Sequence, residues 1–281
     1  MRARWRIRCL LAMDAATIGL HSMPAKTFRV IRSGALPGAR NMALDEALAA
    51  GDPPVPTLRL YRWEPWALSL GYFQRAGEAD LAPFLRAGFC VTRRATGGGA
   101  IFHADELTYA VVLPADDARI PRPAAASYGW LHGAVREALA AVGVPSDIRG
   151  GAAEPEGPDP FFCFARPAPI DLVARGRKIV GSAQRRTRTA FLQHGSIPLS
   201  PNGTAPDATT VSAERGAAAD PSALEEAMVR GFARVLGAEA VDSAPTPEEE
   251  ERAKTIESGK YGRPAWVVHP WRRRDRGSAA M

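Results

Sequence analysis

Cysteine is scarce in this chain of 281 residues, which holds Cys9, Cys90 and Cys163. No two of them form a C-x-x-C pair, so a cysteine-held zinc or iron–sulfur site is excluded. So few cysteines in so long a chain also exclude a disulfide framework. No apolar run is long enough to span a bilayer, so a membrane enzyme is not expected. These absences favour a reducing, cytoplasmic compartment and no membrane partner.

Acidic side chains are fewer than basic ones, but the positive charge is concentrated at the two ends. The formal net charge is +6, with four arginines in the first ten residues and four more, against one aspartate, in the last eleven. The body of the chain is therefore close to neutral. Aromatic residues do not alternate with these arginines as they would on a surface that stacks bases. We therefore expect solvated basic ends and no nucleic-acid partner.

The length and the 46% apolar content allow one substantial core with a small additional part. We expect residues 1–26 to be a disordered N-terminal extension and residues 27–200 to form the main domain. Residues 201–270 are expected to be a C-terminal helical part of the same domain, and residues 271–281 a basic tail.

Hydrophobic periodicity predicts both strands and helices. Alternation predicts strands over 27–33, 57–63, 67–72, 172–174 and 178–183. The second and third are expected to pair around Glu64-Pro65, and the last two across Arg175-Gly176. Helical spacing predicts helices over 39–50, 81–87, 124–142 and 220–236 and another from Thr246.

The stretch from Val91 to Leu113 has the most unusual composition: V-T-R-R-A-T-G-G-G-A-I-F-H-A-D-E-L-T-Y-A-V-V-L. It describes two strands joined by a glycine loop beside two arginines. Three glycines let the backbone approach a ligand closely, and their N–H groups can bind an anion. Only one of the two arginines need face the loop, because neighbouring strand residues point to opposite sides. The spacing is neither a Walker loop nor a dinucleotide fingerprint. Alone, it fits either a site for an anionic or carbonyl-bearing ligand or an ordinary glycine turn.

A second stretch, from Asp171 to Ser200, reads D-L-V-A-R-G-R-K-I-V-G-S-A-Q-R-R-T-R-T-A-F-L-Q-H-G-S-I-P-L-S. Together the two resemble the lipoate/octanoate branch of the biotin and lipoate protein ligase superfamily. In that branch R-R-x-T-G-G-G-A-x-x-H, G-R-K-I-x-G-S-A-Q and L-Q-H-G-S-I recur in this order. The likeness includes N-M-A-L-D-E-A-L, A-L-S-L-G-Y-F-Q and E-L-T-Y, and it covers most of residues 27–199. It implies an α/β (α+β) catalytic domain with a mixed, mostly antiparallel sheet flanked by helices.

Within this branch, the chain is most similar to octanoyltransferases of the LipM type. There, a cysteine at the position of Cys163, followed by Phe, is the acyl-accepting nucleophile, which the ATP-dependent lipoate ligases lack. The resemblance implies that Cys163 takes an octanoyl group from acyl carrier protein. It then passes the group to a lysine on a lipoyl domain of a 2-oxoacid dehydrogenase or on glycine-cleavage H protein. Lys178 is implied to be the active-site lysine that lowers the thiol pKa and helps to hold the carbonyl oxygen. This route uses no cofactor.

The resemblance also implies a substrate-binding set taken from both stretches. Its members are Arg93, Arg94, Thr96, Gly97, Gly98, Gly99, Ala100, His103, Gly181, Ser182, Ala183 and His194. The two histidines either orient neighbouring strands or transfer protons. Leu68, Leu70 and Val111 are candidates for an acyl tunnel.

Two departures keep other functions open. Many of these transferases carry Arg at the position of Gly99, whereas the glycine here resembles the ligases. The segment after Cys163 also lacks the Ser-x-Tyr that is usual there. One alternative is therefore a lipoate-protein ligase that uses ATP and Mg, with Arg93, the glycine loop and Lys178 holding an acyl-adenylate. Another is an amidotransferase that moves octanoyl groups between lipoyl domains. A third is a non-catalytic acyl-carrier-binding module, against which Cys163 and Lys178 argue.

Overall fold

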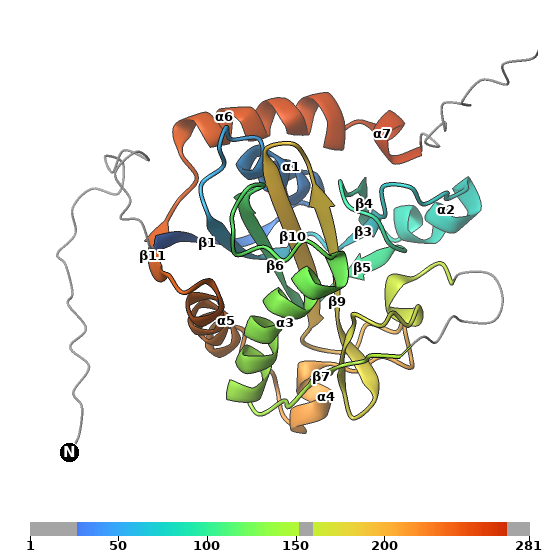
Figure 1. Ribbon diagram of the computed structural model, residues 1–281. Coiled ribbons are helices and arrows are strands. Elements are labelled where there is room, and N and C mark those ends of the chain that lie inside the picture. Colours follow the sequence, from blue (N-terminus) through green and yellow to red (C-terminus); the bar gives the residue numbers. More distant parts are fainter. Residues whose placement is uncertain (1–26, 152–159, 269–281) are drawn as a thin grey trace, which may run out of the picture.

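The computed structural model describes residues 27–151 and 160–268 (Figure 1), so the predicted extension and tail lie outside the described residues. These residues form an eight-stranded sheet and a three-stranded sheet. The large sheet runs in the order β11 (Glu239–Ser243), β1 (Thr27–Leu36), β2 (Thr57–Trp63), β6 (Glu106–Pro114), β10 (Ala190–Pro198), β9 (Arg177–Arg186), β8 (Leu172–Ala174) and β7 (Asp147–Ile148). The small sheet runs in the order β4 (Cys90–Arg93), β3 (Ala67–Leu70) and β5 (Ile101–His103).

The large sheet is mixed and mostly antiparallel, which confirms the predicted fold class. β1 pairs parallel with both β11 and β2. Every other neighbouring pair of strands in this sheet, from β2–β6 to β8–β7, is antiparallel. The expected hairpin across Arg175-Gly176 is present as β8 and β9, with Ala174 opposite Arg177. Arg175 has a φ of 47° and Gly176 a φ of 78° at its turn.

Helices cover both faces of the large sheet (Figure 1). The helices are α1 (Gly38–Ala49), α2 (Glu78–Arg86), α3 (Ala124–Ala141), α4 (Val211–Arg215), α5 (Pro221–Leu236), α6 (Pro247–Ile256) and α7 (Pro264–Val268), with short turns at Cys163–Ala165 and Glu257–Tyr261. Asp220 caps α5 by accepting the N–H groups of Ser222 and Ala223. Thr246 and Glu249 form the expected capping box of α6. None of the described helices is long and apolar enough to cross a membrane.

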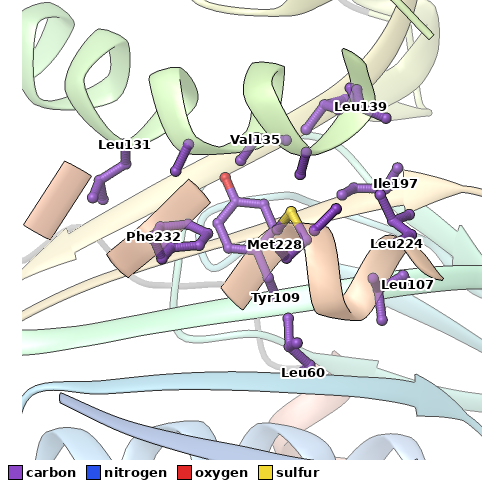
Figure 2. Packing of buried hydrophobic residues seen from close by; sticks show 14 of the residues in the cluster. Leu60, Leu107, Tyr109, Leu131, Val135, Leu139, Ile197, Leu224, Met228 and Phe232 are labelled. Carbon is purple, nitrogen blue, oxygen red and sulfur yellow. The ribbon is translucent and has the colours of Figure 1, made fainter. Parts of the chain in front are cut away.

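One face of the sheet packs against α3 and α5 (Figure 2). Strand alternation places Leu107 and Tyr109 of β6 on this face, where they meet Leu131 of α3 and Phe232 of α5. The intervening β6 residues Ala110 and Val112 belong to the cluster on the opposite face. The main core therefore lies between β6 and the α3–α5 pair.

A buried ion pair ties α1 to the other face. Arg59 of β2 donates to Asp45 of α1 at 2.7 Å, and both side chains are at most 3% exposed. Tyr61 also donates to Asp45, at 2.9 Å. Burial alone would raise the pKa of Asp45, but the Arg59 charge and a hydrogen bond from His194 outweigh it and hold the pKa below the ordinary value.

We expect Asp45→Asn to lower the free energy of unfolding by about 3 kcal/mol or more at neutral pH, because Arg59 is left buried without its counter-charge. A carboxylate with a lowered folded pKa stabilises the fold above its unfolded pKa, about 3.9 for Asp. The stabilisation is lost as pH falls through the folded pKa. Denaturant unfolding of both proteins should therefore show a constant gap above about pH 5 that narrows below about pH 4. A gap that widens in acid would contradict this assignment of charge.

One of the predicted strand pairings is wrong. β2 does not pair with β3, because both edges of β2 are already occupied, by β1 and by β6. The strands that flank the glycine loop do not pair with each other either, since β4 and β5 lie on opposite edges of β3. The glycine loop therefore crosses the end of the small sheet instead of closing a hairpin.

The segment expected to be a helical C-terminal part contributes a strand as well. β11 lies parallel to β1 from Thr27 to Ile31. In the chain, the strands from β2 to β10 all lie between β1 and β11, and α5 leads directly into β11. This part of the chain therefore completes the edge of the large sheet.

Candidate active site

The glycine loop and the turn that carries Cys163 are joined by backbone hydrogen bonds. The Ala100 N–H donates to the Phe161 carbonyl at 2.9 Å, and the Cys163 N–H donates to the Ala100 carbonyl at 2.7 Å. Ala100 and Phe162 form a parallel bridge. Two stretches more than 60 positions apart in sequence are thereby held in a fixed register. We call Cys163–Ala165 and its flanking residues 161–166 the cysteine turn.

A cavity of about 40 Å³ lies beside this junction, and we call it the cysteine cavity. It is lined by Met42, Tyr61, Trp63, Ser69, Arg94, Gly97, Gly98, Ile101, His103, Thr108, Cys163, Gly181, Ser182, Ala183, His194, Gly195 and Ser196. Nine of the residues expected at the site are therefore brought together around one space. Five other expected residues do not line this cavity: Arg93, Thr96, Gly99, Ala100 and Lys178. Leu68, Leu70 and Val111, expected around an acyl tunnel, pack into apolar clusters instead.

Gly98 lies directly against the Cys163 sulfur. Its φ is 96°, in the region that favours glycine, and a Cβ there would lie 3.8 Å from Cys163 Sγ and 2.9 Å from an Arg94 nitrogen. Any larger side chain at this position would intrude between the sulfur and the arginine. The glycine therefore keeps the space next to the Cys163 sulfur open.

Gly99 is closed in for a different reason. A Cβ at Gly99 would lie 2.9 Å from Nε of Arg166, 3.0 Å from the Cys163 nitrogen and 3.0 Å from the Phe161 carbonyl oxygen. The Arg166 guanidinium, which donates to the Pro160 carbonyl, fills the space that a side chain at position 99 would need. This packing leaves no room for a side chain at position 99.

Arg94 is the cation that lines the cysteine cavity. It is 2% exposed, and its Nη atoms donate to the carbonyls of Gly97 and Gly99, both at 2.7 Å, and to Ser69. Its Nε is buried without a hydrogen-bond partner among the described residues. Burial lowers the pKa of Arg94 to about 10, although a Cys163 thiolate would raise it. The guanidinium therefore stays charged at neutral pH and holds one unused donor.

Arg93 has a structural role instead. Its guanidinium donates to the carbonyls of Gly71 and Gln74, both at 2.7 Å, and to the Val267 carbonyl at 2.7 Å. Trp266 returns a hydrogen bond to the Arg93 carbonyl at 2.8 Å. Arg93 thus joins α7 to the small sheet by hydrogen bonds and does not line the cavity.

Lys178 holds the backbone of the cysteine turn. Its ammonium group lies 2.9 Å from Asp171 Oδ1, 2.9 Å from the Cys163 carbonyl oxygen and 3.0 Å from the Arg166 carbonyl oxygen. An ammonium group has three donors, and these acceptors use all of them. Burial raises the pKa of Asp171, an effect that the Lys178 charge only partly offsets. Gly181 makes room for the lysine, because a Cβ there would lie 3.2 Å from Lys178 Cε.

His103 is locked in place by three neighbours. Its ring stacks on Trp63 with centroids 3.7 Å apart, its Nδ1 lies 2.8 Å from Glu106, and its Nε2 lies 2.7 Å from Ser69 Oγ. Burial lowers the pKa of His103, so the ring is neutral, and Nδ1 donates to the Glu106 carboxylate. Glu106 also accepts from Ser196 at 2.7 Å. These contacts make His103 a rigid wall of the cavity.

His194 links the cavity to the buried ion pair of α1. Its Nε2 lies 2.6 Å from Thr96 Oγ1, and its Nδ1 lies 3.3 Å from Asp45. The His194 ring is therefore held at Nε2 by Thr96, which directly precedes the glycine loop, and at Nδ1 by Asp45.

Ser182, on the neighbouring strand, lies within 2.9 Å of both Tyr109 Oη and His132 Nε2.

Ser69, Trp63 and Glu106 were not expected among the site residues. The signal for Ser69 is present in A-L-S-L-G, because a single polar residue between two fully buried leucines must face the opposite side of the strand. Glu106 gives no such signal, since only the fold shows that its carboxylate meets His103. Among the described residues, no group of three or more His, Cys, Asp or Glu side chains could hold a metal ion.

We expect Gly71→Ala to reduce the activity of this site by about 100-fold, since the added Cβ would lie 1.9 Å from the Gly98 carbonyl oxygen and force the glycine loop to move. The measurement is the steady-state turnover rate. The matched control is Gly133→Ala in α3, whose Cβ meets nothing closer than 3.8 Å. The control should retain full activity and gain about 0.5–1 kcal/mol of stability. Equal activity of the two variants would show that the loop tolerates displacement.

Comparison with known proteins places this site in a family. The model of the lipoyl protein ligase A/B catalytic domain matches residues 37–241. Octanoyltransferase LipM of Symbiobacterium thermophilum is 35% identical over 269 residues, which cover 85% of this chain and 97% of that protein. The LipM protein of Moorella thermoacetica is 34% identical over 272 residues, covering 87% of this chain and 99% of that protein.

Solved structures show the same fold. Lipoate-protein ligase A bound with ATP superposes with a TM-score of 0.73 at 24% identity, covering 87% of this chain and 99% of that chain. A T. acidophilum protein assigned as a lipoate protein ligase, with bound lipoic acid, gives a TM-score of 0.72 at 25% identity, with coverage of 86% and 99%. The LipM relatives are acyltransferases, which confirms the enzyme class predicted from the sequence. The chain belongs to the lipoyl protein ligase A/B catalytic domain family.

Proposed function

We propose that the protein is an octanoyltransferase of protein lipoylation. In this proposal an octanoyl group passes from acyl carrier protein to Cys163 and then to the ε-amine of a lysine. The acceptor lysine belongs to a lipoyl domain of a 2-oxoacid dehydrogenase or to glycine-cleavage H protein. The observation that carries the proposal is the position of Cys163, which lines the same cavity as the glycine loop and Arg94. The LipM relatives, octanoyltransferases by name, support the same acyl group.

In the first step the Cys163 thiolate attacks the carbonyl carbon of the donor thioester. The bond from Sγ to this carbon forms, the bond from the carbon to the donor sulfur breaks, and the released donor thiolate takes up a proton from solvent. Arg94 and Cys163 line the same cavity, so the guanidinium can pair with the Cys163 thiolate.

In the second step a neutral lysine amine attacks the octanoyl thioester. The C–N bond forms, the bond to Sγ breaks, and the amine releases one proton to solvent as Cys163 returns to the thiolate. A thioester is already activated, so neither step requires a nucleotide. The backbone clamp of Lys178 keeps Sγ in one place through both steps.

The test is the intact mass of the enzyme after mixing with octanoyl-acyl carrier protein in the absence of nucleotide. We expect an added octanoyl group that is removed when an unmodified lipoyl domain is supplied. A lipoate ligase would show no adduct and would join free octanoate or lipoate to the domain only with ATP and Mg. An amidotransferase would accept the octanoyl group from octanoylated H protein but not from the carrier protein. A binding module would give no product from any donor.

A further inference from the structure

A second cavity, of about 150 Å³, adjoins the cysteine turn, and we call it the outer cavity. Its walls are the start of β5 and β6, the cysteine turn, and the segment from Pro198 to Ala213 that follows β10. Ile101 lines both cavities. Phe162 and Phe164, which flank Cys163 in sequence, line the outer cavity, whereas Cys163 itself lines the cysteine cavity. The two spaces therefore share Ile101 and lie on either side of the cysteine turn.

The wall formed by 198–213 is fixed to the site. The Leu199 N–H donates to the Asp105 carbonyl at 2.9 Å, and the side-chain amide of Asn202 donates to the Phe102 carbonyl at 3.1 Å. The Thr209 N–H donates to the carbonyl of Lys178 at 2.8 Å. The outer cavity is thus built from the same framework that clamps the cysteine turn.

The lining combines apolar walls with uncharged polar groups. Phenylalanine, proline and alanine side chains alternate with the hydroxyls of Ser200 and Thr204 and the amide of Asn202. The two charged residues in the lining are Glu106 and Arg177. Glu106 is 2% exposed and already accepts hydrogen bonds from neighbouring side chains, whereas Arg177 is exposed at the rim. Apart from the buried Glu106 carboxylate, the lining of the outer cavity is therefore uncharged up to Arg177, which is exposed.

We propose that the outer cavity binds the phosphopantetheine arm of the acyl donor. The inference rests on the proposed function. A thioester carbonyl at Cys163 has two substituents, the acyl chain and the sulfur of the arm, which leave the carbonyl carbon in different directions. The cysteine cavity and the outer cavity supply two such directions. The arm is narrow, carries two amide groups and a hydroxyl along its length and ends in a phosphate, which matches hydroxyl and amide partners inside and Arg177 at the rim.

Ala213 and Ala217 provide a matched pair of variants. Ala213 lines the outer cavity and is exposed on α4, so Ala213→Phe narrows the cavity without disturbing the core. Ala217 is also exposed and does not line the cavity, so Ala217→Phe adds the same side chain nearby. The first half-reaction is followed by the mass of octanoyl-enzyme formed from two donors. One donor is octanoyl-acyl carrier protein, and the other is S-octanoyl-N-acetylcysteamine, which lacks most of the arm.

We expect Ala213→Phe to raise the carrier-protein concentration for half-maximal acylation by about tenfold or more. Acylation by the small thioester and transfer from preformed octanoyl-enzyme to a lipoyl domain should remain unchanged, and Ala217→Phe should change nothing. Equal slowing with both donors would overturn the proposal in favour of a structural wall. Slowing of the transfer step alone would assign the cavity to the acceptor lysine. If wild-type enzyme is acylated by neither donor, the proposed function fails, not the assignment of this cavity.

Arg177 allows a second, independent measurement. Pantetheine and 4′-phosphopantetheine are used as competitors of acylation by the carrier protein. Arg177→Gln should weaken inhibition by the phosphorylated compound about fivefold to tenfold and leave inhibition by pantetheine unchanged. An equal loss for both compounds, or inhibition by ATP that exceeds inhibition by 4′-phosphopantetheine, would overturn the assignment.

Discussion

Cys163→Ala is expected to abolish the octanoyl-enzyme adduct and to lower octanoyl transfer to a lipoyl domain by a factor on the order of 10⁴ or more, as removal of a covalent nucleophile does. The substitution keeps the backbone hydrogen bond from residue 163 to the Ala100 carbonyl, because that bond uses no side-chain atom. The cysteine turn should therefore remain in place, and the loss should be chemical. The measurements are intact mass without nucleotide and single-turnover transfer with the carrier-protein donor.

The matched control is Cys90→Ala. Cys90 is also a free cysteine of intermediate exposure, but it begins β4 and packs against the apolar cluster on the face of the large sheet that α1 covers. This variant should form the adduct at the wild-type rate. Persistence of the adduct in Cys163→Ala would move the acyl group to another residue. ATP-dependent ligation of free lipoate or octanoate by Cys163→Ala would replace the transferase by a ligase.

The sequence predicted the elements better than it predicted their partners. β2 and β3 were recognisable as strands because apolar residues fill them, but alternation describes the faces of a strand and not its edges. β2 pairs with β1, the strand before it, and with β6, four strands later, so its pairing depends on the whole topology. The same limit applies to β11, which lies beside β1 although nearly the whole described chain separates the two strands.

The candidate site residues were predicted from motifs. The motifs did not distinguish residues that line the cavity from residues that bind neighbouring backbone. Arg94 and Arg93 are adjacent in sequence, yet Arg94 lines the cysteine cavity and Arg93 fastens α7. Alternation predicts that the two point apart, but not which of them faces the loop. The contact between Gly99 and Arg166 could not be predicted from the sequence either, because 67 positions separate the two residues and no periodic pattern relates them.

Lys178 was expected to act on the thiol through its charge, and its contacts add a second role. The ammonium group holds the carbonyls of Cys163 and Arg166, so the lysine fixes the turn on which the sulfur is mounted. A charge effect and a positioning effect respond differently to pH. Loss of a nearby cation raises the thiol pKa, and high pH compensates for it by ionising the thiol. Loss of position is not repaired by pH, since the thiolate that forms is misplaced.

We therefore expect Lys178→Ala to slow acylation of Cys163 by about 100-fold at neutral pH, and to stay well below wild type even at the pH where alkylation shows the thiol to be fully ionised. The measurements are the pH profile of Cys163 alkylation by iodoacetamide and the pH profile of acylation by octanoyl-acyl carrier protein. Lys254→Ala is the control, because this lysine is exposed on α6 and pairs only loosely with Glu251 at 3.4 Å. Full recovery of Lys178→Ala at high pH would leave the charge as its whole contribution. Unchanged profiles would make it an ordinary strand lysine. Persistent slowness with an ionised thiol would show that the enzyme needs the turn held by Lys178 as much as it needs the thiolate itself.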